Sequence, residues 1–359
     1  FTDNGLGMTA EEVNEYINQI AFSGAEAFLE KYKDKTNEDQ IIGHFGLGFY
    51  SAFMVAEKVT IDTLSYKEGS KPVHWECEGG TEYDMGDGNK DTVGTTITLY
   101  LNEDSTEFAN EFRAKEVIDK YCSFMPYEIY LDNEDDTEEK TQMIDKDELL
   151  DTDTIIETVK KEAKLEEQED EDGNKKMVEV EPATERYKIA KRPVSLSDTT
   201  PLWTKHPNDC TDEEYKEFYR KVFHDYKEPL FWIHLNMDYP FNLKGILYFP
   251  KINIEFESAE GIIKLYNNQV FVADNIKEVI PEFLMLLKGV IDCPDLPLNV
   301  SRSALQNDGF VKKISEYITK KVADKLSGMC KTDKESYEKY WDDISPFIKF
   351  GCLKDDKFC

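Results

Sequence analysis

The sequence predicts an α+β protein in which two domains of helices and strands flank a highly acidic segment. Thr9–Glu12 and Thr211–Glu214 are capping boxes, and each opens a run of apolar residues at helical spacing. Short apolar runs after each box predict strands. Between the two domains, acidic residues and lysine dominate, so little of that segment can be buried. The expected division is a first domain at residues 1–131, a charged linker with some transient helix at 132–186 and a second domain at 187–359.

The first domain is expected to begin with the helix that Thr9 caps, which continues through Val13, Ile17 and Ile20. A glycine-rich stretch at residues 43–48 precedes a strongly apolar one at 49–55, which predicts a buried helix. The other expected elements are a short helix at 25–31, strands at 58–64, 73–77, 95–101 and 128–131, and a helix at 108–121 with Phe108, Phe112, Ile118 and Tyr121 facing inward.

The second domain is expected to mix strands and helices, which predicts an α/β architecture. The helix that Thr211 caps carries an apolar face of Tyr215, Phe218, Tyr219 and Val222. Strands are expected at 245–249, 252–256 and 262–272, and further helices at 279–290, 310–326 and 334–344.

The composition excludes several classes of function. With 43 basic and 74 acidic residues the net charge is −31, which repels phosphate backbones and makes a nucleic-acid partner unexpected. No apolar run reaches the length of a membrane span, so no membrane segment is expected. The seven cysteines are widely spaced without a CxxC pair and the five histidines are scattered, so neither a disulfide framework nor a metal site is expected. Reduced thiols of this kind are typical of a cytoplasmic protein.

Three glycine-bearing elements carry the chemical information. The first, Asp3-Asn4-Gly5-Leu6-Gly7-Met8, follows what reads as the end of a strand, so the natural start of the protein is expected upstream of Phe1. Its glycines allow the backbone to approach a ligand, and its carboxylate can accept a hydrogen bond from an exocyclic amine such as that of adenine. An ordinary turn is the alternative reading, because Asp-Asn-Gly is also a common turn sequence.

The second element, Gly43-His44-Phe45-Gly46-Leu47-Gly48, precedes the predicted buried helix, whose N-terminal N–H groups could bind phosphate oxygens. A dinucleotide fingerprint would need a strand directly before the glycines, and a tight loop that only packs the helix is an equal alternative. The third element, Gly94-Thr95-Thr96-Ile97, could bring a threonine hydroxyl to the base, although plain strand alternation is the favoured interpretation of this element by itself.

Together, in this order and spacing, these elements resemble the ATP site of the superfamily that includes heat-shock protein 90, DNA gyrase B, MutL and the sensor histidine kinases. Longer stretches resemble heat-shock protein 90 itself, of the bacterial type: residues 20–24, 42–53, 225–230, 289–292 and 295–302. The resemblance implies a two-layer α/β sandwich that binds ATP, of the Bergerat (GHKL) type and truncated at its start, followed by an α/β middle domain. It also implies a mobile lid at about residues 9–42.

The resemblance assigns roles to individual residues. Asp3 is expected to bind the adenine amine, Gly7 and Met8 to line the base pocket, Thr95 to lie near the base, and Gly46, Gly48 and Phe49 to lie at the phosphates. Arg302 is expected to reach the γ-phosphate when the domains dock, with Gln306 assisting. An arginine delivered late stabilises charge on the transferring phosphoryl oxygens, whereas the plain alternative for Arg302 is a surface salt bridge. Trp203 matches either an exposed contact for client proteins or a core tryptophan.

The implied function is that of an ATP-dependent molecular chaperone, a cytoplasmic ATPase that uses ATP and Mg²⁺, remodels unfolded or partly folded client proteins and forms a homodimer when intact. The family's catalytic glutamate and magnesium-binding asparagine would lie upstream of Phe1, and its dimerisation domain after Cys359, so residues 1–359 alone are expected to hydrolyse ATP negligibly. Two positions depart from the family pattern: Phe22 stands where a lysine is usual, and Ala25 where a threonine is usual.

Three other functions compete with this one. A DNA-acting ATPase of the gyrase B or MutL kind would need a basic groove and a phosphate-binding lysine loop in the second domain, and the net charge of −31 and the Asn-Val-Ser-Arg element at 299–302 argue against it. A sensor histidine kinase would end soon after the third glycine element, whereas well over two hundred residues follow that element here. A non-hydrolysing module would bind client proteins without turnover.

Overall fold

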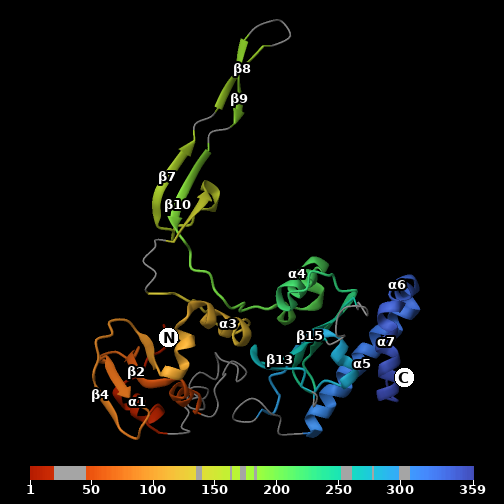
Figure 1. Cartoon of the computed structure of the whole chain (residues 1–359), viewed down its shortest axis with the longest axis horizontal. Helices are drawn as coiled ribbons and strands as arrows, with labels where there is room; N and C mark the ends of the chain where they lie inside the picture. Colours follow the sequence, from red (N-terminus) through yellow and green to blue (C-terminus); the bar gives the residue numbers. More distant parts are fainter. Residues whose placement is uncertain are drawn as a thin grey trace. The chain divides into compact units, whose positions relative to one another are not determined.

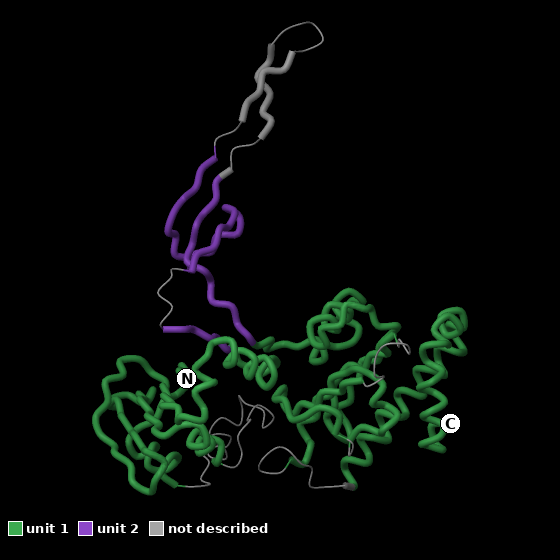
Figure 2. The backbone as a smooth tube through the Cα atoms, viewed as in Figure 1, with its two compact units in different colours: residues 1–128, 197–359 green, residues 129–196 purple. Residues whose placement is uncertain are grey.

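The computed structural model describes residues 1–19, 46–134, 140–161, 164–169, 175–181, 184–251, 261–276, 279–298 and 308–359 (Figure 1). The chain forms two compact units (Figure 2). The first unit comprises residues 1–128 and 197–359 and contains two separate five-stranded sheets. The second unit comprises residues 129–196.

The N-terminal sheet is antiparallel, with the strand order β1-β5-β2-β3-β4. Helix α1 (Ala10–Tyr16) begins as predicted, with the Thr9 side chain accepting from the Glu12 N–H in a capping box. Val13 of α1 packs against Val59, Ile61 and Trp75 to form the core of this sheet. The strands are β1 (Thr2–Asp3), β2 (Ala56–Leu64), β3 (Val73–Cys77), β4 (Tyr83–Asp87) and β5 (Gly94–Leu101). The predicted strands at 58–64, 73–77 and 95–101 are confirmed, whereas β4 was not predicted because it is short and contains a glycine and two aspartates, residue types that are depleted in strands.

Two predictions in this part of the chain are wrong, those for 49–55 and 128–131, and the helix predicted at 108–121 is confirmed only for residues 111–121. Residues 49–55 do not form a buried α-helix but most of the 3₁₀-helix η2 (Gly48–Met54), which covers the core with one side only, so that Met54 is 79% exposed. Residues 108–121 divide into η3 (Glu103–Ala109) and α3 (Glu111–Tyr121), because the Asn110 side chain caps a new helix there. Phe112 faces outward (73% exposed) and Tyr121 is also exposed, in contrast to the inward positions predicted for them. Residues 128–131 form no strand, and the helix predicted at 25–31 lies outside the described residues.

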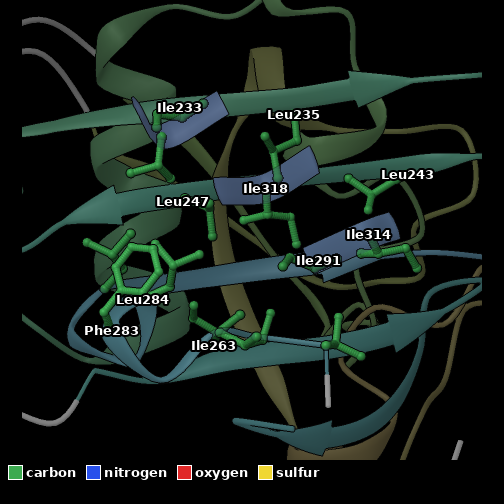
Figure 3. Close-up of a cluster of buried hydrophobic side chains, with 14 of the residues drawn as sticks. Ile233, Leu235, Leu243, Leu247, Ile263, Phe283, Leu284, Ile291, Ile314 and Ile318 are labelled. Atoms are coloured by element: carbon green, nitrogen blue, oxygen red, sulfur yellow. The ribbon is translucent and has the colours of Figure 1, made fainter. Parts of the chain in front are cut away.

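The second sheet has the order β11-β12-β15-β13-β14, in which β13 and β15 run parallel and the other neighbours antiparallel. Alternate residues of β12 face opposite sides, so each side carries its own hydrophobic core. Leu247 packs with Ile314 and Ile318 of α5 on one side (Figure 3). The strands are β11 (Phe231–Met237), β12 (Leu243–Phe249), β13 (Ile263–Asn267), β14 (Val270–Asp274) and β15 (Lys288–Asp292); the helices are α4 (Asp212–Phe223), α5 (Asp308–Thr332), α6 (Lys334–Lys339) and α7 (Trp341–Lys354).

The second capping box is confirmed, since the Thr211 side chain accepts from the Glu214 N–H and α4 buries Tyr215, Phe218 and Tyr219. The helix predicted at 279–290 is wrong, because residues 282–286 form a 3₁₀-helix (η7) and residues 288–292 are strand β15. Two neighbouring strands pair with β15, and this pairing overrides the local helical pattern. The single strand predicted at 262–272 is two strands, joined at Asn268 and Gln269, which both have positive φ.

Two further predictions complete this domain. The helix predicted at 310–326 is confirmed and extends over the 25 residues of α5. The helix predicted at 334–344 is interrupted at Tyr340, between α6 and α7. The strand predicted at 252–256 lies outside the described residues.

The second unit contains strands where we expected transient helix. Its three-stranded sheet has the order β6-β10-β7, and β8 pairs with β9. Ion pairs across the strands, such as Arg186 with Asp145 and Lys160 with Glu185, explain why a segment so rich in charge forms sheet. The acidic composition of this segment predicts that its side chains are exposed but does not predict their local conformation, so it did not reveal these strands. The predicted domain boundaries remain predictions. The strands are β6 (Thr141–Asp145), β7 (Ile155–Lys161), β8 (Lys164–Glu169), β9 (Lys175–Glu181) and β10 (Thr184–Ala190).

We predict that acid loosens this unit between about pH 4 and pH 2. The Arg192 guanidinium donates to both carboxylate oxygens of Asp153, at 2.8 and 2.6 Å, and holds the pKa of Asp153 at about 2. A carboxyl whose pKa is depressed by folding stabilises the fold above its unfolded pKa of about 3.9, and this contribution is lost as the pH falls. The methyl NMR signal of the buried Ile189 will report the urea midpoint of the unit, which should stay level above about pH 4 and fall below it.

Two variants define the origin of that acid response. Asp153→Asn should lower the urea midpoint at neutral pH and flatten its decline below about pH 4, because the titrating partner of Arg192 is gone. Asp151→Asn, at an exposed position two residues away, should leave the profile unchanged. An equal acid response in Asp153→Asn would show that other carboxyls control it.

Candidate functional site

Asp3 and Thr95 lie opposite each other on the adjacent strands β1 and β5. The Asp3 side chain is exposed, and its Oδ1 accepts a hydrogen bond from the Gly5 N–H at 2.8 Å, which holds the carboxylate over the turn that follows β1. Within the described residues its Oδ2 accepts no hydrogen bond. The carboxylate is therefore oriented by its own loop and keeps an oxygen for a donor on a ligand.

Gly7 and Gly94 place this loop against the sheet. Gly7 has φ +62°, and a Cβ there would lie 1.9 Å from the carbonyl oxygen of Leu64. Gly94 has φ +129°, and a Cβ there would lie 2.1 Å from the carbonyl oxygen of Asp3. Neither position has room for a side chain, and both have a backbone conformation that L-residues rarely adopt. Gly7 of the first element and Gly94 of the third thus allow the backbone segments around Asp3 to pack closely against each other.

Thr63 joins the first and third elements and was not among the predicted site residues. It is fully buried on β2, directly opposite Thr95. The Met8 N–H donates to Thr63 Oγ1 at 2.9 Å, and the Thr63 hydroxyl lies 3.2 Å from the Gly94 carbonyl oxygen and 3.0 Å from Thr95 Oγ1. The sequence places Thr63 in a predicted strand, but only the strand register brings it to Met8 and Thr95.

Glu12 connects the start of α1 to Lys67, which follows strand β2. Its Oε2 accepts the Thr9 N–H at 2.8 Å, and its Oε1 accepts from Lys67 Nζ at 2.8 Å. Burial opposes ionisation of Glu12, but the hydrogen bonds from Lys67 and Thr9 outweigh it and hold its pKa below the ordinary value. The Tyr66 N–H also donates to the Leu6 carbonyl oxygen at 2.8 Å. The Asp3–Met8 loop is therefore anchored on both sides.

The second glycine element lies at the start of η2. Phe49 packs edge-on against Trp75, with ring centroids 5.7 Å apart, and both Phe49 and Met8 pack against the same buried cluster. A Cβ on Gly48 would have no neighbouring atom within 4 Å, so the backbone there is open to an approaching group. The first N–H groups of a helix have no partner inside it and suit an anion.

These features fit an adenine nucleotide at two points. The Asp3 carboxylate can accept from an amine on the base, and the open backbone at Gly48 and Phe49 can donate to phosphate oxygens. Two cavities in this domain, of about 790 and 590 Å³, are lined by other residues. The first is lined by residues 76–78 and 80–84, and the second by residues 9–11, 67–73 and 85–87. Most of the predicted lid, together with Phe22 and Ala25, lies outside the described residues.

The two predicted catalytic residues, Arg302 and Gln306, also lie outside the described residues, so their roles stay predictions. Trp203 is fully buried, which settles its two alternatives in favour of a core residue. Within the described ranges no group of three or more histidine, cysteine, aspartate or glutamate side chains could hold a metal ion. None of the helices in those ranges is long and apolar enough to cross a membrane. All seven cysteines are free thiols.

Comparison with known proteins gives one consistent result. Residues 1–79 match the family model described as histidine kinase-, DNA gyrase B- and HSP90-like ATPase, and residues 107–358 match the model described as Hsp90 protein. The chain is 46% identical over 357 residues to chaperone protein HtpG of Bacteroides thetaiotaomicron, covering 99% of this chain and 46% of the relative. It is 45% identical to chaperone protein HtpG of Porphyromonas gingivalis, with coverages of 99% and 45%.

A more distant relative agrees. Chaperone protein HtpG of Idiomarina loihiensis is 33% identical over 359 residues, which cover 99% of this chain and 50% of the relative. The chain thus spans about half the length of the curated relatives that it matches.

Proposed function

The chain belongs to the Hsp90 family, and we propose that it forms the nucleotide-binding and middle parts of an ATP-dependent molecular chaperone. The observation that carries this proposal is the arrangement around Asp3. An exposed carboxylate stands opposite Thr95, and Thr63 ties Thr95 to the Met8 backbone. That arrangement is suited to hold an adenine base and lies in the part of the chain that matches an ATPase family model.

In this proposal, different residues of the chain bind the adenine base, bind the phosphates and stabilise the transition state of ATP hydrolysis. Asp3 accepts from the adenine amine, with Gly7, Met8 and Thr95 around the base. The N–H groups at Gly48 and Phe49, with the backbone at Gly46, receive the phosphates. Arg302 approaches the γ-phosphate when the middle part docks, and Gln306 assists. Because the transition state spreads negative charge over the phosphoryl oxygens, an arginine that arrives late favours it over the ground state.

The remaining parts of the proposal concern the whole protein. Mg²⁺ would accompany ATP and neutralise phosphate charge. The full-length protein would act in the cytoplasm as a homodimer that closes around unfolded or partly folded client proteins and reopens after hydrolysis. These steps are proposed from the names of the relatives, which are chaperones, and from the ATPase-type family model that the chain matches.

The experiment that tests the proposed function is steady-state ATP hydrolysis by the full-length protein that contains this chain. Arg302→Ala is expected to lower the rate at least about tenfold, since a catalytic arginine contributes more than 1.4 kcal/mol to phosphoryl transfer. Nucleotide affinity should change much less, because the arginine acts on the transition state.

Arg113→Ala is the matched control. Arg113 is a partly exposed arginine on α3 whose ion pairs with Glu107 and Glu116 represent the surface-salt-bridge alternative for Arg302. Its loss should leave hydrolysis unchanged. Equal rates for Arg302→Ala and the unsubstituted protein would withdraw the catalytic role of Arg302.

Two other functions fit the findings less well. A DNA-acting ATPase would share the first family model, but residues 107–358 match the Hsp90 model, and the net charge of −31 opposes DNA. A client-binding module without turnover would bind unfolded protein equally well with and without ATP. An aggregation assay in the presence and absence of ATP separates that function from the proposed one.

A further inference from the structure

We propose that β7 is a docking edge, at which an extended, positively charged segment of another polypeptide adds as a fourth strand. The surface consists of Ile155–Lys161 in the second unit and requires no nucleotide. Success or failure of this inference is therefore independent of the proposed ATPase function.

The position of β7 in its sheet is the first observation. The strand order is β6-β10-β7, so β7 pairs with β10 on one side and no described strand pairs with its other side. In an antiparallel sheet every second residue of such an edge strand directs its N–H and C=O outward. These groups can pair with an incoming extended chain, which is how peptides add to exposed sheet edges.

The side chains of β7 are the second observation. All seven residues are exposed, and they include three β-branched apolar side chains, Ile155 (47%), Ile156 (41%) and Val159 (41%). Such residues favour strand pairing and gain free energy when a partner covers them. The opposite edge, β6, is shorter, buries Ile144 and runs directly into the 3₁₀-helix η4 (Lys146–Glu148), so it offers a smaller surface.

Charge identifies the occupant. Residues 129–196 contain 22 acidic and 11 basic residues, a net charge of −11. A second copy of the same edge would bring two such units together, and their repulsion opposes that pairing. A basic segment is attracted instead. β7 itself carries Glu157 and two lysines, of which Lys160 is already paired through its Nζ with Glu185 of β10 at 3.0 Å and Lys161 is the last residue of the strand, so the attraction comes from the acidic unit as a whole.

The register of side chains on β7 also specifies the partner's pattern. Glu157 and Val159 are two residues apart and share one face of the strand. Cross-strand neighbours interact in pairs, so a lysine or arginine opposite Glu157 and an apolar residue opposite Val159 complement this face. The occupant is thus an extended segment that places a basic residue opposite Glu157 and an apolar residue opposite Val159 on this face.

The test uses the full-length protein that contains this chain and a fluorescent nine-residue peptide with lysine and valine in alternating pairs, which presents alternating basic and apolar residues on both faces. Binding is followed by fluorescence anisotropy at low and high salt. The expected result is saturable binding that weakens with salt, together with slower amide hydrogen exchange in β7 and unchanged exchange in β6.

Matched variants separate strand addition from general attraction. Val159→Lys should weaken binding at least about tenfold, because it removes an apolar contact and places like charge at the edge. Met143→Lys adds the same charge at a similarly exposed position (47%) on β6 and should change binding less than about twofold. Both substitutions are on exposed strand positions, and retention of the Ile189 methyl signal confirms an intact sheet.

Two peptide controls complete the design. Replacing the lysines by glutamates should abolish binding, and methylating alternate backbone nitrogens should do the same by removing donors to the strand edge. The inference is overturned if the peptide does not bind, if the methylated peptide binds equally, if both lysine variants lose affinity equally, or if β7 gains no protection.

Discussion

Trp203→Ala is expected to destabilise the second sheet and its helices by about 3–5 kcal/mol, the range for removing a buried tryptophan. The Trp203 ring is fully buried. Its centroid lies 4.7 Å from that of Phe124, 5.2 Å from Tyr266 and 5.8 Å from Phe218. Alanine would leave a cavity among these rings, and the aromatic pairs would be lost with it.

A buried carboxylate adds to this cost. The indole Nε1 of Trp203 donates to Asp292 Oδ2 at 3.2 Å, and that carboxyl is buried. Burial raises the pKa of Asp292, which shows that its charged form is costly where it lies. Without Trp203 the Oδ2 keeps the Gln269 N–H at 3.0 Å but loses a donor that helps to stabilise the charge.

Urea unfolding followed by circular dichroism measures this loss. Tyr226→Ala is the control, because Tyr226 is an aromatic residue of the same unit that is 89% exposed, and its removal should cost less than about 0.5 kcal/mol. A loss below about 1 kcal/mol for Trp203→Ala would mean that the surrounding side chains collapse around the missing ring and that Trp203 contributes little to the stability of this core.

Asp3→Asn is expected to lower the affinity for adenine nucleotides at least about tenfold, since a hydrogen bond to a charged group contributes roughly 1.5–3 kcal/mol. The asparagine keeps a carbonyl oxygen but loses the charge, and its amide group cannot accept from the base amine. The fold should be unaffected, because Asp3 is exposed and its described hydrogen bond is the local one from Gly5.

Isothermal titration of the full-length protein with a non-hydrolysable ATP analogue measures that affinity. Asp84→Asn, at an exposed position on β4 of the same sheet, is the control and should bind like the unsubstituted protein. If Asp3→Asn also binds the nucleotide with unchanged affinity, the Asp3 carboxylate does not contact the base, and the base must bind elsewhere on the protein.

Local sequence signals predicted the elements whose causes are local. Both capping boxes begin helices where expected, because the cap and its partner lie within one turn of each other. The strands at 58–64 and 73–77 also formed, since alternation reflects a sheet with one buried face. The same reasoning failed at 279–290, where pairing with distant strands converts a helical pattern into η7 and β15.

The features of the candidate site also separate into those that the sequence reveals and those that only the tertiary structure reveals. The candidate site residues Asp3, Gly7 and Gly94 can be identified in the sequence, because they belong to glycine-bearing elements with recognisable spacing. The sequence also determined the family, since long matching stretches retain their order along the chain. The tertiary structure alone decided that Thr63 links Met8 to Thr95, that Trp203 is buried and that β7 is an edge. These three properties depend on strand register and on packing between residues far apart in the chain, which no local pattern encodes.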